Sequence, residues 1–89
     1  MKHYKDLFGK NITKPDMVQA VLHTVRTGNP YPANIARRMS IGFFKAKRLV
    51  QVIADAGVAT PIDSGKRRVL LKEDAAINAA LRQLKKGSK

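Results

Sequence analysis

The chain has 89 residues, enough for one small domain with a modest core. Its 18 lysines and arginines against 6 aspartates and glutamates give a net charge of +12, which favours polyanionic partners, nucleic acid first and an anionic membrane surface second. The absence of cysteine excludes disulfide scaffolds, thiolate zinc sites and thiol nucleophiles. Because no apolar run has the length of a signal core or a membrane span, we expect neither.

The first part of the chain predicts an arm followed by two helices. Residues 1–12 have mixed charge and no clear period, so we expect an N-terminal arm there. A first helix follows, in which Thr13 is the predicted N-cap and Asp16 lies three positions later, as in a capping box. The Gly-Asn-Pro sequence at 28–30 should end this helix. A short second helix is expected at roughly 33–39.

A third helix, at about 42–56, shows the strongest apolar repeat and follows a tight turn at Ser40 and Ile41. Gly57 is a suitable left-handed residue after its end. The predicted inward stripe, with Leu49 at its flank, consists of Phe43, Ala46, Val50 and Ile53. The opposite side holds Phe44, Lys45, Lys47, Arg48, Gln51 and Asp55.

Beyond the third helix the pattern changes to two short β-favouring runs, at 58–62 and 68–71. The Asp-Ser-Gly sequence between them has the composition of a hairpin turn, and three cations at 66–68 lie beside its tip. A last helix is expected within 72–89, with acidic residues in its first turn and a basic tail.

This order of elements is typical of a winged helix-turn-helix. The predicted fold class is therefore mainly α with a small β-hairpin: a three-helix core and a basic wing at 13–71, and an extra C-terminal helix with a basic tail at 72–89. In that architecture the third helix enters the major groove of DNA and the hairpin lies along the backbone or minor groove. One face of the third helix would then hold the domain together, and the other would face DNA.

The stretch RRMSIGFFKAKRLVQVIADAGV resembles the C-terminal winged-helix (gamma) domain of the FtsK-type DNA translocases. That family has the pattern R-x-F-x-I-G-Y-N-R-A-A-R-L-I-x-x-L-E-x-x-G-I-V, and the following TPIDSGKRRVLL is similar to its wing, G-P-x-x-G-S-K-P-R-E-V-L. The direct matches in the helix are Ile41, Gly42, Ala46, Arg48, Leu49 and Gly57. The resemblance covers roughly 16–71 and implies a domain that reads short G-rich DNA sequences and touches a tyrosine recombinase.

The resemblance also implies site residues. Lys45 and Arg48 lie where the family contacts DNA, and Phe44 lies where the family has a base-reading asparagine. A phenyl ring cannot replace the hydrogen bonds of an amide but can contact a thymine methyl, so we expect a target other than the translocase's own. The predicted base-reading residues are Phe44, Lys45, Arg48 and Gln51, and packing of Phe44 against the N-terminal arm or a second subunit stays open as the alternative. The predicted phosphate contacts are Arg37, Arg38, Lys47, Lys66, Arg67 and Arg68.

The sequence therefore favours a sequence-preferring, double-stranded DNA-binding protein: a transcriptional regulator or an accessory factor in recombination or segregation, in the cytoplasm at the nucleoid. No phosphate-binding loop of an ATP motor occurs, and two histidines with scattered acids suggest no metal site, so we expect no enzyme, metal or cofactor. Two alternatives stay open: an adaptor that binds a recombinase or another DNA-bound protein, and a sequence-blind nucleoid binder. Homodimers and tandem copies on DNA stay open as well.

Overall fold

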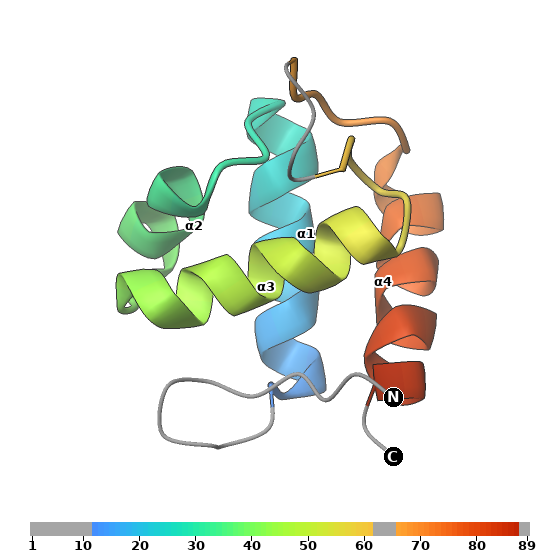
Figure 1. The fold of residues 1–89 in the computed structure, drawn as a ribbon, viewed down its shortest axis with the longest axis horizontal. Coiled ribbons are helices and arrows are strands. Elements are labelled where there is room, and N and C mark those ends of the chain that lie inside the picture. Colours follow the sequence, from blue (N-terminus) through green and yellow to red (C-terminus); the bar gives the residue numbers. More distant parts are fainter. Residues whose placement is uncertain (1–11, 62–65, 88–89) are drawn as a thin grey trace.

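Four helices make up most of the part of the chain that the computed structural model describes, residues 12–61 and 66–87. The predicted arm up to residue 11, the hairpin turn and the end of the basic tail lie outside those ranges, while Ile12, the last residue of the predicted arm, is buried in the core. The helices, shown in Figure 1, are α1 (Lys14–Thr27), α2 (Pro32–Met39), α3 (Phe43–Asp55) and α4 (Glu73–Gly87).

The helices α1 and α4 lie side by side and run in opposite directions, while α3 crosses in front of α1 (Figure 1). At one end of the pair the Arg26 guanidinium lies 3.2 Å from the Glu73 carboxylate. All four helices contribute to the buried core, whose members include Met17, Ala20, Val21, Ile35, Leu49, Ile53, Ala76 and Ala80. This arrangement leaves the side of α3 that faces away from α1 uncovered.

The ends of the helices follow the local signals in the sequence. The hydroxyl of Thr13 accepts the backbone N–H of Asp16 at 3.3 Å, which confirms the predicted N-cap of α1. At the end of α3, Gly57 takes the left-handed conformation with φ 79°, and the N–H of Val58 donates to the carbonyl of Ile53 at 3.1 Å. This is a Schellman motif, and it confirms Gly57 as the residue that ends the third helix.

A turn of three residues joins α2 to α3 and sets how the two helices meet. Ser40 has a φ of 53°, and the N–H of Ile41 donates to the carbonyl of Ala36 at 3.1 Å. The left-handed conformation costs a residue other than glycine about 1 kcal/mol, so the surrounding packing must hold it. Gly42 then begins α3 without a side-chain cap.

The predicted β-hairpin, and with it the winged helix-turn-helix fold class, is wrong. Within the described residues no strand forms, and one isolated antiparallel bridge between Ala59 and Val69 joins the two runs. The N–H of Arg68 donates to the side-chain hydroxyl of Thr60 at 3.0 Å and not to the Thr60 carbonyl, so the next ladder bond is not made on one side, and α4 begins at Glu73, shortly after the bridge, on the other. The mainly helical part of the prediction holds, and the described residues on either side of the predicted hairpin turn, 58–61 and 66–71, form no regular element apart from this bridge.

The predicted inward stripe of α3 also needs a correction at its first residue. Phe43 is 51% exposed, because the first turn of α3 extends past α1 (Figure 1). Val52, which the stripe omitted, is fully buried. The remaining members of the stripe, Ala46, Val50 and Ile53, are buried as expected.

Candidate nucleic-acid interface

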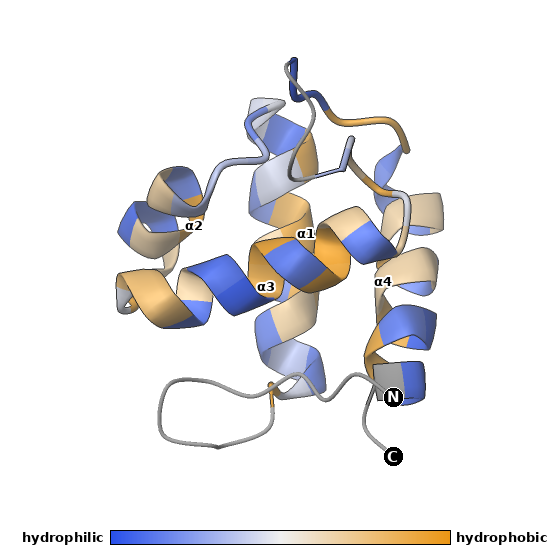
Figure 2. Ribbon diagram, in the orientation of Figure 1, coloured by the Kyte–Doolittle hydropathy of each residue, from blue (hydrophilic) through white to orange (hydrophobic). Residues whose placement is uncertain are grey.

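One face of α3 points away from the core, and we call it the outer face: Phe44, Lys47, Arg48 and Gln51. Their spacing of three, four and seven positions places them on the same side of a helix. In Figure 2, hydrophilic residues alternate with hydrophobic ones along α3, the pattern of a helix with one polar and one apolar side. Phe44 is 58% exposed on this face, so it does not serve the core.

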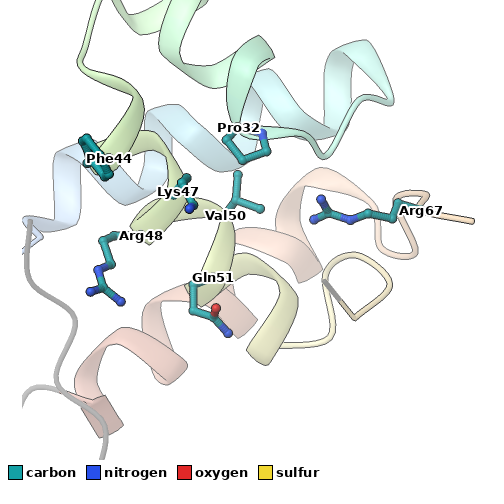
Figure 3. Close-up of a pocket in the computed structure, with 7 residues that line it drawn as sticks. All are labelled: Pro32, Phe44, Lys47, Arg48, Val50, Gln51 and Arg67. Atoms are coloured by element: carbon teal, nitrogen blue, oxygen red, sulfur yellow. The ribbon is translucent and has the colours of Figure 1, made fainter. Parts of the chain in front are cut away.

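The outer face borders a hollow of about 500 Å³ that we call the basic groove. Its lining residues, drawn in Figure 3, are Pro32, Phe44, Lys47, Arg48, Val50, Gln51 and Arg67. Three of these residues carry positive charge and none is acidic. Arg48 and Arg67 lie on opposite sides of the groove, with apolar atoms of Val50 and Pro32 between them (Figure 3).

The cations that α3 contributes to the groove are not neutralised. No ion pair joins Lys47 or Arg48 to an acidic side chain in the part of the chain that the structure describes. The ammonium of Lys47 lies 5.9 Å from the ring centroid of Phe43, a cation–π distance that leaves its charge intact. Uncompensated cations around a concave surface produce a positive potential that attracts anions.

Gln51 is oriented by its neighbour one turn further along α3. Its side-chain N–H donates to a carboxylate oxygen of Asp55 at 2.9 Å. This hydrogen bond holds the Gln51 amide group in one orientation at the edge of the groove. Asp55 itself does not line the groove.

The structure does not bring Lys45 together with the other predicted base-reading residues. Its ammonium lies 3.0 Å from a carboxylate oxygen of Asp16 on α1, and it does not line the basic groove. Burial acts to raise the pKa of Asp16, but hydrogen bonds from Lys45 and Thr13 and the charge of Lys45 together hold it below its ordinary value. Lys45 thus links α3 to α1.

Arg67 is the member of the basic segment 66–68 that reaches the groove. Its guanidinium stacks 4.7 Å from the ring centroid of Tyr31 and donates to the carbonyl of Pro30 at 3.3 Å. Its buried Nε atom has no hydrogen-bond partner among the described residues. Sequence reasoning missed the contact with Tyr31, although the Pro-Tyr-Pro sequence at 30–32 indicated a rigid loop that presents an aromatic ring.

The remaining predicted phosphate contacts lie outside the groove. Lys66 and Arg68 are exposed, and only the backbone of Arg68 is engaged, through an N–H that donates to the hydroxyl of Thr60 at 3.0 Å. On α2, Arg37 and Arg38 are exposed as well. These side chains form an exposed basic margin around the molecule rather than part of the hollow.

Arg38 also has a structural contact. Its Nε donates to the side-chain oxygen of Asn34 at 3.0 Å, and Asn34, only 3% exposed, donates in turn to the hydroxyl of Thr27 at 2.9 Å. This network joins α2 to the end of α1. Arg38 is therefore held in place, whereas Arg37 has no such contact among the described residues.

Other kinds of site find no support in the described residues. No three histidine, aspartate or glutamate side chains there are grouped to hold a metal ion. None of the helices in residues 12–61 and 66–87 is long and apolar enough to cross a membrane. The basic groove is therefore the candidate functional site.

A comparison with known proteins finds a similarity over part of the chain. A region of 46 residues, 52% of the chain, is 33% identical to the DNA translocase FtsK of Haemophilus influenzae. The matched region spans 9% of that protein. No protein-family model and no solved structure matches the chain. A region of this chain is therefore similar to part of a DNA translocase.

Proposed function

We propose that the protein binds double-stranded DNA with a sequence preference, by placing the outer face of α3 in the major groove. The observation that carries this proposal is the basic groove, which has three cations and no acidic residue in its lining. Proteins that read DNA with two helices joined by a short turn place the second helix in the major groove, and α2, the turn and α3 have that order. The net charge of +12 supports the same reading.

In this proposal the groove residues have separate tasks. Arg48 binds a guanine with two hydrogen bonds, and Gln51 contacts a neighbouring base. Lys47 and the exposed cations of the basic margin, Arg37, Arg38, Lys66 and Arg68, bind phosphates and set the register without reading sequence. Lys45 and Arg67 position the elements that carry these residues, since each is engaged by another part of the fold.

The similarity to a DNA translocase supports the assignment of this region to the C-terminal gamma domain of that family. On this proposal the chain has no catalytic activity and no cofactor, and it serves as a regulator of transcription or as an accessory factor in recombination or segregation, at the nucleoid. Its departure from the family at Phe44 implies a target of its own.

Selection of bound duplexes from a random library, at about 150 mM salt, tests the proposal. We expect a recovered motif that binds about 10³-fold more tightly than a scrambled duplex. Equal affinity for both duplexes, with the same steep salt dependence, would mean a sequence-blind DNA binder. No binding to any duplex would leave the adaptor alternative.

A matched pair of variants separates the groove from overall charge. The double substitution Lys47→Ala with Arg48→Ala and the double substitution Lys85→Ala with Lys86→Ala each remove two exposed positive charges, from α3 and α4 respectively. We expect the first to abolish the preference for the selected motif and the second to weaken the motif and the scrambled duplex equally. Equal effects of the two on the motif would contradict readout by α3.

A further inference from the structure

Phe44 is the residue of the basic groove that neither the fold nor the charge explains. It is 58% exposed and is absent from the buried core cluster, so its ring contributes little to stability. A single exposed ring needs no explanation by itself, but this ring borders the groove that we propose to bind DNA, where a bound duplex would remove part of it from water.

The neighbouring ring does not share this position. Phe43 lies outside the lining of the groove, and the ammonium of Lys47 sits over its ring at 5.9 Å. Phe44, in contrast, borders the groove together with apolar atoms of Pro32 and Val50 (Figure 3). The groove therefore combines an apolar contact surface with the hydrogen-bonding groups of Arg48 and Gln51.

We propose that Phe44 reads thymine, by apolar contact with the C5 methyl group that thymine presents in the major groove. This inference rests on the proposed function and adds to it the base that the ring recognises. Thymine has the methyl group that other bases lack at that edge, and phenylalanine is among the side chains that contact it.

The helix geometry places this thymine relative to the guanine bound by Arg48. The two residues are four positions apart, about 6 Å along the helix axis, and stand on the same face. Base pairs are spaced by about 3.4 Å, so the thymine and the guanine lie within about two steps of each other. The target then contains a thymine next to, or one position removed from, a guanine.

Replacing thymine by deoxyuridine tests the inference, because this change removes the methyl group and keeps the pairing with adenine. The selected duplex is remade with one thymine replaced at a time, and each version is titrated with the wild-type protein and with Phe44→Ala. We expect about a fourfold loss of affinity at one position for the wild type. Phe44→Ala should bind the thymine and deoxyuridine duplexes equally.

The variant Phe43→Ala is the matched control, since it removes a similarly exposed ring from the adjacent residue. It should keep the response to deoxyuridine even where it weakens all duplexes through the loss of its contact with Lys47. Thermal unfolding of each variant shows that the fold is intact, which the exposure of both rings leads us to expect.

Three results would overturn the inference, and they differ in what they say about DNA binding. A wild-type protein that binds every deoxyuridine duplex as tightly as the thymine duplex overturns the reading of thymine and leaves the proposed function standing. The same holds if Phe44→Ala and wild type respond identically. A wild-type protein that recovers no motif overturns the proposed function and this inference together.

Discussion

The two sides of α3 use neighbouring residues for unrelated purposes. Arg48 is exposed on the outer face, while Leu49, the next residue, is fully buried. The inner side is at most 2% exposed and consists of Ala46, Leu49, Val50, Val52 and Ile53. The outer face contributes little to that packing, so substitutions on the two sides should affect stability and binding separately.

The largest effect is expected on the inner side. Leu49→Ala removes a fully buried side chain and should lower the free energy of unfolding by about 2–5 kcal/mol, through lost transfer free energy and the cavity left behind. Phe44→Ala, on the outer face, is the control, because Phe44 is 58% exposed and should change stability by less than about 0.5 kcal/mol. Urea unfolding compares the two, and equal losses would mean that the two sides do not differ as described.

The next largest effect, a loss of DNA affinity, is expected from a substitution on the outer face of α3. Arg48→Ala should cost about 1–3 kcal/mol of binding free energy on the selected duplex and leave the melting temperature unchanged, because the side chain is exposed. Lys45→Ala, on the flank paired with Asp16, should change that affinity by less than about threefold. Titration of the selected duplex with both variants measures the two affinities. A loss larger than about threefold for Lys45→Ala would mean that Lys45 also contacts bases.

A smaller effect is expected where the basic segment meets the loop before α2. Arg67→Ala removes the stacking on Tyr31 and should lower stability by about 0.5–1 kcal/mol. A double-mutant cycle with Tyr31→Ala measures the coupling by thermal unfolding.

Arg68→Ala, with an exposed side chain, should leave stability unchanged and reduce the salt dependence of DNA binding by about one released ion. The comparison fails if the two arginine variants behave alike.

The smallest effect lies at the flank of α3 and depends on pH. The pKa of Asp16 is lowered in the folded protein, so its charge stabilises the fold above the ordinary value of 3.8 and loses this effect as the pH falls through the folded value. Asp16→Asn should therefore cost about 0.5 kcal/mol at pH 7, a size typical of a partly exposed ion pair. At about pH 2, below the carboxyl range, the variant and the wild type should be equally stable in urea.

Local signals in the sequence were sufficient for the helices and their ends. Thr13 and Gly57 act within a few residues of themselves, so their roles can be inferred without knowing the fold. The β-hairpin was wrong because a preference for extended backbone at 58–62 and 68–71 does not determine whether a ladder of pairs forms. That outcome depends on the Thr60 hydroxyl, which takes the N–H of Arg68, and on how soon α4 begins.

The candidate site was predictable in part for the same reason. Helical periodicity alone identifies the face that carries Phe44, Arg48 and Gln51. The partners of Lys45 and Arg67 lie on other elements, and Pro30, which accepts from Arg67, is 37 positions away along the chain. Such contacts depend on how α3 crosses α1 and on how the segment before α4 packs against the loop before α2. A local sequence pattern predicts neither arrangement.

The pairing of α1 with α4 has a consequence for the newly made chain. The ion pair that joins them links residues 47 positions apart, so α1, which is made before the other described helices, packs against α4, which is made after them. The side of α1 that faces α4 stays in contact with water during translation, and the core closes only when α4 emerges. We therefore expect folding to finish as a single late step, with α1 accessible to chaperones until then.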